Sequence, residues 1–461
     1  MSGSLAATAQ DKAGLVPEAR ATSIRWLLIF WLFVLSAVAF LDRVNLSIAG
    51  KFVAAEFHLT DIQLGNVLSA FLLGYAIFQI PGGRLADRVG PRRILAIGVI
   101  WWGVFTALTA VVSSSAGHAV LLLVAVRFLL GAGEAIIYPA SNRFVALWIP
   151  SQERGAANGW IFAGVGVGSG ATPLLITYIV THLGWRWSFW ISATVGLLAG
   201  LIWFLISRDA PEQHPWVSPG ELAFIRNSGV QKSGLVDEAS VASAVKRVVP
   251  WSSILRSSNV WAVTVSYFCF GYIAWIFFGW FYTYMAKVRG LDLKATAAFS
   301  TLVFLVMAAA SPVGGVISDA LVKRRGQRFG RASVAIVSMA AASVFLILGS
   351  KADSPGLASV VLAGGAGALY LSQSSFWSVS ADIAAGSSGS VSGFMNMGAQ
   401  LGGAVTTTLT PMIASRYGWA ASFYVAAAFA IIGAFTWLIV DPNTRLDSSL
   451  IGPTSSGSKG T

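Results

Sequence analysis

Long apolar runs separated by short polar segments dominate the sequence. In the first half of the chain the runs lie at about 25–52, 62–86, 91–113, 118–148, 153–181 and 184–207. In the second half they lie at about 259–287, 293–321, 330–351, 355–381, 388–415 and 418–440. A membrane-spanning helix needs roughly 20 consecutive apolar residues, whereas strands of a membrane barrel show alternation over roughly 10 residues. The pattern therefore predicts an all-α membrane protein with twelve transmembrane helices.

The longest polar segment separates the two sets of six runs. We predict an N-terminal six-helix bundle over 25–207, a central loop over 208–258 and a C-terminal six-helix bundle over 259–440. Tails at 1–24 and 441–461 flank the two bundles.

Two short motifs occur once in each half. Residues 82–87 (GGRLAD) recur as 314–319 (GGVISD), and Gly184-Trp185 recurs as Gly418-Trp419. Because each half has an even number of spans, both copies have the same orientation in the membrane. The repeat predicts two pseudo-symmetric halves related by an axis along the membrane normal.

The charged residues are few and unevenly placed. They make up 11% of the chain, against roughly 25% in soluble domains, which excludes a soluble globular protein. The net charge is +12, and 22 of the 31 Lys and Arg residues fall on the tails, the central loop and the connections on the same side. Cytoplasmic loops accumulate Lys and Arg. The bias therefore predicts cytoplasmic termini in a multi-pass protein of the cell inner (plasma) membrane, in contact with lipid and with no nucleic-acid partner.

The sequence offers little for catalysis or metal binding. Cys269 is the single cysteine, and the four histidines lie in loops or at span ends. No nucleophile arrangement, metal cluster or nucleotide-binding motif is found in the spans or loops. We expect no enzyme activity, no metal and no cofactor, and we expect a monomer.

Four ionisable side chains lie well inside predicted spans: Asp42, Arg43, Arg127 and Glu134. Each costs about 2.5 to 3.5 kcal/mol at a helix centre, so each needs a partner or a function. Glu134 follows Arg127 by seven residues and shares its helix face. Two structural ion pairs would satisfy all four. A cavity of two arginines and two carboxylates would also suit an anion symporter, since arginine binds carboxylates bidentately and a buried carboxylate can carry a proton.

Two segments resemble signatures of the major facilitator superfamily. Residues 83–93 (GRLADRVGPRR) are similar to its loop 2–3 signature, and residues 127–134 (RFLLGAGE) to its fourth-helix signature. Within the superfamily, 41–47 (LDRVNLS) and 79–83 (QIPGG) resemble the anion:cation symporter family. That family includes bacterial proton-coupled sugar-acid importers, such as the galactonate, hexuronate and glucarate transporters. The resemblance covers about 25–441 and implies import of a small organic anion, such as a hexuronate or aldonate, by proton symport with alternating access.

The resemblance also implies roles for individual residues. Arg43 would bind the substrate carboxylate, Arg127 would share in binding and pair with an acid, and Asp42 and Glu134 would carry protons. Further substrate-binding positions follow from the same resemblance, although aromatic residues in spans are also typical of packing: Tyr75, Gln79, Trp280, Tyr284, Ser375, Trp377 and Asn396.

A charged cluster lies at the predicted cytoplasmic helix ends. Its members are Gly83, Asp87, Arg88, Arg92 and Arg93, with a weaker counterpart around Asp319 in the second half. Two interpretations stay open. The cluster is typical of positive-inside anchoring, and it would also serve as a gate whose ion pairs stabilise an outward-open state.

Two positions depart from the sugar-acid importers. Phe40 stands where they have a tyrosine, and Val165 where they have a glutamine. Both replacements remove groups that bind hydroxyls. An importer of aromatic or dicarboxylic acids, of phthalate or tartrate type, is therefore an alternative. A proton-coupled exporter is another, although the fifth span lacks the glycine-proline pattern of drug/proton antiporters, which favours import.

Overall fold

The computed structural model describes residues 21–115, 117–230 and 248–446, so the predicted tails and the middle of the central loop lie partly outside it. Within the described residues, eleven helical segments are long and apolar enough to cross a membrane. The segments of the first half are α1 (Ile24–Phe57), α2 (Asp61–Val89), α3 (Pro91–Val111), α4 (Ala119–Glu134) continued by α5 (Ile137–Trp148), α6 (Arg154–Leu183) and α7 (Trp185–Ile206).

The second half contains a corresponding series. Its first span is α11 (Ser258–Trp275), which three short helical segments extend to Val288: η2 (Ile276–Trp280), α12 (Phe281–Thr283) and η3 (Tyr284–Val288). The next spans are α13 (Leu293–Arg325), α14 (Gln327–Lys351) and α15 (Pro355–Leu371), and α15 is continued by α16 (Gln373–Ile383). The last two are α17 (Ser388–Tyr417) and α18 (Trp419–Thr436). Helix α17 is as long as the others but more polar, and it occupies the predicted span 388–415. The all-α prediction is confirmed.

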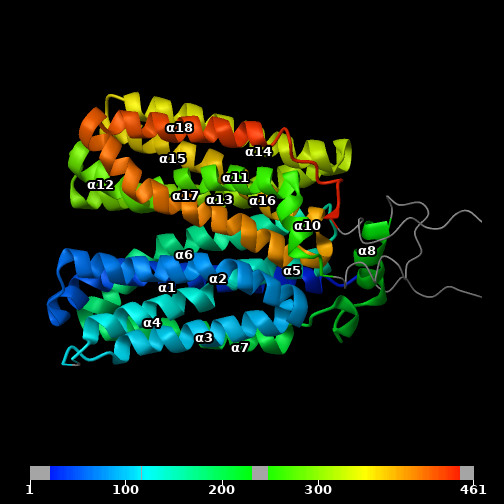
Figure 1. The fold of residues 1–461 in the computed structure, drawn as a ribbon, viewed down its shortest axis with the longest axis horizontal. Helices are drawn as coiled ribbons and strands as arrows, with labels where there is room; N and C mark the ends of the chain where they lie inside the picture. Colours follow the sequence, from blue (N-terminus) through cyan, green and yellow to red (C-terminus); the bar gives the residue numbers. More distant parts are fainter. Residues whose placement is uncertain (1–20, 116, 231–247, 447–461) are drawn as a thin grey trace, which may run out of the picture.

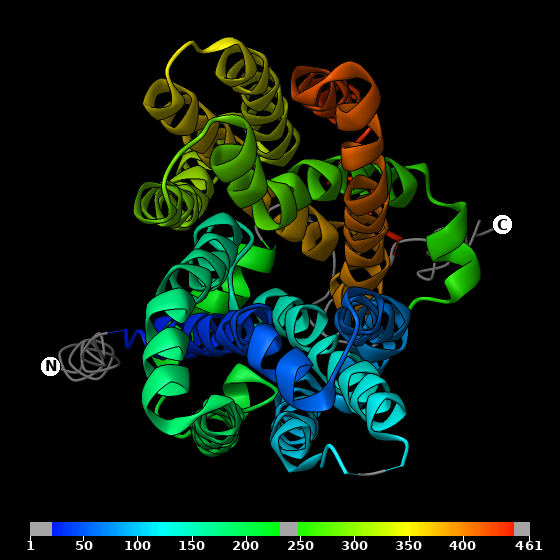
Figure 2. The same cartoon turned by 90° about the vertical axis from the view of Figure 1, so that its left-hand side faces the viewer.

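The helices form two groups that lie side by side (Figure 1). Helices α1 to α7 make up one group and α11 to α18 the other, and a view along the bundle shows the same division (Figure 2). The main contacts between the groups are those of α6 with α13 and of α2 with α17. The bounds of the two predicted bundles remain a prediction.

One end of the bundle carries both ends of the described chain. Thr22 donates to Glu221 of α8 (Pro219–Val230), and the amide of Asp441 donates to Asn259 at the start of α11. Helix α10 (Trp251–Arg256) lies at the same end (Figure 1). We call this end the termini face.

The repeated Gly-Trp motif forms the same turn in both halves. Gly184 ends α6 with φ 92°, and Gly418 ends α17 with φ 81°. Only glycine adopts such a conformation without steric cost. Each glycine therefore lets one long helix turn directly into the next, which begins at the adjacent tryptophan.

Glycines of α6 allow close approach to two neighbouring helices. A Cβ at Gly164 would overlap the carbonyl oxygen of Phe33 in α1, and one at Gly166 would overlap that of Phe304 in α13. Small residues permit such backbone contact between membrane helices. Helix α6 thus packs tightly on α1 within its own half and on α13 across the interface.

The fourth span is interrupted in both halves. Helix α4 ends at Glu134, and the amide of Ile136 donates to the carbonyl of Gly133. Helix α15 ends at Leu371, and the amide of Ser372 donates to Leu369. Gln373 then begins α16. Glu134 is thus the last residue before the break in the first half, and Gln373 is the first helical residue after the break in the second half.

Candidate functional site

A cavity of about 380 Å³ lies between the two groups of helices. Its first wall comes from α1, α2, α4, α5 and α6, and its second wall from α11, η2, α13, α15, α16 and α17. Most lining side chains are aromatic or aliphatic, and Phe40 and Val165 are among them. The departures noted in the sequence therefore lie in the cavity wall. Such a cavity, apolar with a few convergent polar groups, is typical of a small-molecule site.

Arg43 is held on the first wall by one acid and by aromatic rings. Its Nη2 donates to Oε1 of Glu134 at 2.5 Å, and its Nε donates to the same oxygen at 3.1 Å. The guanidinium carbon lies 4.4 Å from the ring centroids of both Phe40 and Tyr75. These contacts fix the orientation of the guanidinium while Arg43 and Tyr75 still line the cavity.

Arg127 also lines the cavity, from α4, but its guanidinium has open donors. The residue is 1% exposed, and its guanidinium carbon lies 5.0 Å from the ring centroid of Phe71. Its Nε and Nη1 have no hydrogen-bond partner among the described residues. A buried cation with unbound N–H groups is strongly disfavoured unless an anion binds it.

The two carboxylates lie behind the arginines, outside the cavity lining. Asp42 is fully buried, and its Oδ2 accepts from Thr106 of α3 at 2.5 Å. Within the described chain, Oδ1 of Asp42 and Oε2 of Glu134 have no hydrogen-bond partner. The resemblance implied an acid partner for Arg127. Asp42 and Glu134 both lie near enough to attract its guanidinium, whereas the direct ion pair of this group is formed by Arg43 and Glu134.

Asn396 of α17 lines the cavity, but five of the other predicted substrate-binding residues do not. Gln79 is fully buried on α2, where Gly393 of α17 approaches its backbone. Trp280 and Tyr284 pack on Trp419, with ring centroids 6.2 and 5.5 Å away. These three residues lie at helix contacts in this structure.

The remaining two lie on α16. Ser375 is buried, and its hydroxyl has no hydrogen-bond partner among the described residues. Trp377 donates from Nε1 to the hydroxyl of Tyr267 at 2.8 Å, and its ring lies 4.9 Å from that of Phe162. Tyr267 and Phe162 both line the cavity. Trp377 therefore supports the wall from behind.

Several cavity residues were not singled out from the sequence, among them Tyr138, Tyr267, Gln373 and Gln400. Tyr138 and the Ser36 hydroxyl share a hydrogen bond of 2.9 Å. The one sequence signal for Gln373 is the polar stretch at 372–375 (SQSS) inside an apolar span. Because most of these residues are single tyrosines and glutamines on different helices, only the packing of the helices brings them together.

The repeated motif joins the two groups at the termini face. The Asp87 carboxylate accepts from the amides of Gly389 and Ser390, at the start of α17, at 2.9 and 2.7 Å. The Asp319 carboxylate accepts from the amides of Gly155 and Ala156, at the start of α6, at 3.0 and 2.6 Å. In both copies an aspartate of one group binds a helix N-terminus of the other, where an anion is favoured.

Glycine precedes the aspartate in each copy for a steric reason. A Cβ at Gly83 would overlap the carbonyl oxygen of Gly389, and one at Gly315 would overlap that of Gly155. The close approach of the helices, and hence both pairs of aspartate bonds, depends on these glycines.

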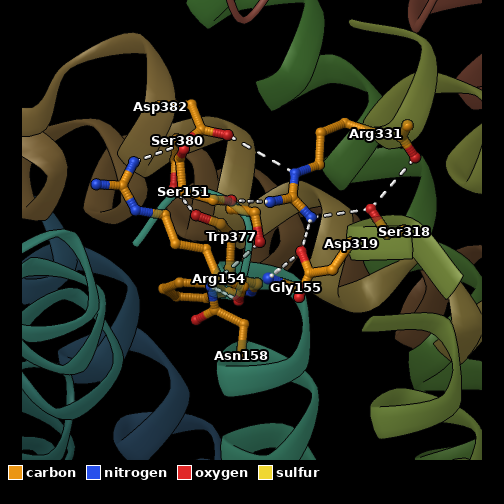
Figure 3. Close-up of polar contacts among 12 residues, drawn as sticks. Ser151, Arg154, Gly155, Asn158, Ser318, Asp319, Arg331, Trp377, Ser380 and Asp382 are labelled. Atoms are coloured by element: carbon orange, nitrogen blue, oxygen red, sulfur yellow. Dashed lines mark hydrogen bonds and ion pairs between the residues drawn. The ribbon is translucent and has the colours of Figure 1, made fainter. Parts of the chain in front are cut away.

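Arginines extend the contact around Asp319 (Figure 3). Arg331 donates from Nη1 to Asp319 at 2.7 Å and from Nη2 to the carbonyl of Ser151 at 2.7 Å. Arg154 donates to Asp382 of α16 at 2.5 Å. The bonds of Arg331 to Ser151 and of Arg154 to Asp382 join the two groups of helices, whereas the bond of Arg331 to Asp319 lies within the second group. None of the three residues Arg154, Arg331 and Asp382 was singled out from the sequence.

The other predicted members of the cluster lie elsewhere. Arg88 and Arg93 are exposed, and Arg92 donates to the carbonyl of Phe204 in α7, within its own group. None of these three arginines bonds to the opposite group in the described part of the chain. Asp87, Gly83 and Asp319 are the members that touch the opposite group.

The cavity is closed toward the termini face. Stacked rings of Tyr138 and Phe162, 4.8 Å apart, and Trp377 beside them lie between the cavity and this network. The other lining residues extend to Ser47 in the last third of α1 and Leu68 near the start of α2, toward the opposite face.

Sequence comparison places the chain in a family of membrane transporters. The sequence model of the Major Facilitator Superfamily matches residues 32–407 and 320–454. The chain is 33% identical over 413 residues to a probable sulfoacetate transporter of Cupriavidus necator, covering 89% of this chain and 92% of that protein. It is 32% identical over 358 residues to a probable galactarate/D-glucarate transporter of Bacillus subtilis, covering 77% of each chain.

Solved structures show the same fold. The proton:xylose symporter XylE matches with a TM-score of 0.70 and 16% identity, over 92% of this chain and 98% of that one. The fucose:proton symporter FucP matches with a TM-score of 0.66 and 15% identity, over 91% and 99%. At this identity the likeness concerns the fold alone.

Proposed function

Because the chain belongs to the Major Facilitator Superfamily, we propose that it is a secondary active transporter that imports an organic anion together with protons. The observation that carries the proposal is the buried guanidinium of Arg127, which lines the cavity with two nitrogens unbound. By their names, the two relatives of known sequence described above transport anions, sulfoacetate in one case and galactarate or D-glucarate in the other. The proposed substrate is a sugar acid such as a hexuronate or aldonate.

Arg127 and Arg43 together would hold the acid group. Both line the same part of the first wall, and both contact the ring of Phe71 at 5.0 and 5.3 Å. Guanidinium donors match the two oxygens of a carboxylate, and such charge-assisted bonds are strong where water is excluded.

Proton coupling follows from competition for Arg43. Glu134 occupies the Nε and Nη2 donors that a substrate carboxylate would use. Protonation of Glu134 removes its charge and releases Arg43 to the substrate. It also keeps the buried site neutral when the anion enters, since two arginines and two carboxylates already balance. Asp42, bound to Thr106, is the second proposed proton carrier.

Alternating access would rock the two bundles about this cavity, with the termini face in the cytoplasm of a monomer in the inner membrane. The aspartate contacts with α17 and α6 would stabilise an outward-open state, because they hold the two groups together at the termini face. Opening of the termini face requires that both sets of bonds break.

The double variant Asp87→Asn, Asp319→Asn is expected to shift the protein toward the inward-open state. Each substitution replaces a buried carboxylate that accepts from two amides, which costs about 1 to 3 kcal/mol. The combined loss changes the ratio of the two states at least tenfold. Spin labels at the exposed positions Leu183 of α6 and Ser415 of α17, at the face opposite the termini, report the change as a shorter distance.

Arg88→Gln is the matched control, since this arginine belongs to the same motif but is exposed. Its distance distribution should equal that of the unsubstituted protein. An unchanged distribution in the double variant would leave the cluster with an anchoring role alone.

Uptake into proteoliposomes tests the proposed function directly. The panel contains uronates, aldonates, sulfoacetate, dicarboxylates and benzoates, each with and without an inward proton gradient. We expect saturable uptake of one class that an acidic exterior accelerates. Uptake that ignores the gradient, or transport only against protons, contradicts the proposal.

A second candidate is an importer of aromatic or dicarboxylic acids. Phe40 and Val165 line the cavity where hydroxyl-binding groups were expected, and Phe71, Phe162 and Phe270 add to the apolar wall. The benzoate and dicarboxylate arms of the panel decide between the two candidates.

A further inference from the structure

Three side chains of the second half form a bonded group at the cavity. The hydroxyl oxygen of Tyr267 accepts from Nε2 of Gln373 and from Nε1 of Trp377, both at 2.8 Å. Tyr267 and Gln373 line the cavity and are 3% exposed each, whereas Trp377 lies behind them against Phe162. The group joins α11 to the first two turns of α16.

The bonding leaves at least one donor and one acceptor unused. A phenol oxygen has two lone pairs and one hydrogen, and the indole of Trp377 can only donate. With two donors on the oxygen, the hydrogen of Tyr267 has no acceptor among the described residues. Oε1 of Gln373 is likewise buried without a partner there. Exchange of the amide N and O of Gln373 also leaves donors and an acceptor unused, because the two amide N–H groups and one tyrosine lone pair then have no partner in this group.

Tyr267 and Gln373 lie on the neutral wall of the cavity, and the other wall is positively charged. Arg43 and Arg127 line the cavity from α1 and α4, while the residues that line it from the second half carry no charge. An anion bound to the arginines therefore presents its other end to neutral groups. A substrate group that both donates and accepts is a hydroxyl, and it would satisfy Tyr267 and Gln373 together.

Resting on the proposed function, we propose that Tyr267 and Gln373 form a hydroxyl-binding subsite, which selects organic anions with a hydroxyl at the end away from their acid group. A site with buried polar groups rejects an analogue that leaves them unpaired. The subsite places hydroxyl-binding groups on the second half of the protein. In the first half, Phe40 and Val165 stand where the sugar-acid importers have such groups. Trp377 is a positioning residue, because it holds the Tyr267 oxygen.

Binding of matched acids to the purified full-length protein tests the subsite. The probes are D-galactonate with its 6-deoxy analogue D-fuconate, and 6-hydroxyhexanoate with hexanoate. Each pair differs by one terminal hydroxyl. Titrations followed by tryptophan fluorescence should show that the unsubstituted protein prefers the hydroxylated member of a pair about tenfold. Tyr267→Phe removes the donor and should reduce this preference to about twofold or less, with the affinity for the deoxy member unchanged.

A second variant tests the same subsite independently, and a control variant shows that the effect is specific to it. Gln373→Met should reduce the preference in the same way if Tyr267→Phe fails to fold. Tyr272→Phe alters a tyrosine five residues further along α11, stacked on Phe429 outside the cavity lining, and should keep the preference. Equal binding of both members of a pair, or a preference that survives both variants, overturns the subsite and leaves the transporter proposal standing. Binding of no probe by the unsubstituted protein overturns the subsite and the sugar-acid proposal together.

Discussion

Arg43→Ala is expected to abolish substrate binding and uptake. The substitution removes one of the two cations that line the cavity and leaves Glu134 buried without its partner. Truncating one partner of a buried charged pair costs about 2 to 5 kcal/mol, so affinity should fall at least thirtyfold. Binding to purified protein and uptake into proteoliposomes measure the two losses separately.

Two further substitutions serve as comparisons for Arg43→Ala, one with an intermediate effect and one with none. Arg43→Lys keeps the charge but loses the fork that holds Glu134 through two nitrogens, so an intermediate affinity is expected. Arg226→Ala is the control, because Arg226 of α8 forms an exposed ion pair with Glu212, far from the cavity lining. Binding by Arg43→Ala with unchanged affinity would exclude this residue from the substrate site.

Glu134→Gln is expected to separate binding from proton coupling. Glutamine imitates the protonated acid and cannot hold Arg43 by charge, so the substrate still binds. In the unsubstituted protein, affinity should rise as the pH falls, because proton uptake by Glu134 accompanies binding of the anion. In the variant this pH dependence should largely disappear, and uptake driven by a pH gradient should fall to background.

Exchange of labelled for unlabelled substrate, without a gradient, should persist in Glu134→Gln and shows that the variant still cycles. Glu56→Gln is the control, since Glu56 pairs with Arg186 near the other end of α1. Acidification-driven uptake at the normal rate in Glu134→Gln would remove Glu134 from the proton pathway.

Most helix bounds could be predicted to within a few residues. The run at 184–207 corresponds to α7 at Trp185–Ile206, and the run at 355–381 to α15 and α16, which end at Ile383. The agreement has a simple cause. Lipid leaves no partner for a free backbone amide, so each long apolar run must be helical. Glycines with positive φ then mark where the helices end.

The candidate site could be predicted only in part. Asp42, Arg43, Arg127 and Glu134 stand out because ionisable side chains inside apolar spans are rare and costly. Nothing in the sequence shows that Glu134 binds Arg43, since 91 residues separate them. The partner depends on which helices are neighbours and on how far each side chain reaches.

Tyr267, Gln373 and Trp377 show the same limit. Each is a common residue in a membrane helix, and the sequence alone does not distinguish Tyr267 from Tyr272. Only the packing of α11 against α16 places two donors on one hydroxyl. Trp280 and Tyr284 show the converse, because the family resemblance implied a role in the pocket and the structure packs them on Trp419.

The sequence by itself determined that this chain is a helical membrane protein, where its spans lie, and which four buried charges need an explanation. These properties follow from hydropathy and local conformation, which act within one helix. The tertiary structure decided which arginine is paired, which aspartates join the two groups of helices, and which polar atoms of the cavity wall are left without a partner. Those outcomes depend on distances of a few ångströms between helices, which no local pattern of residues encodes.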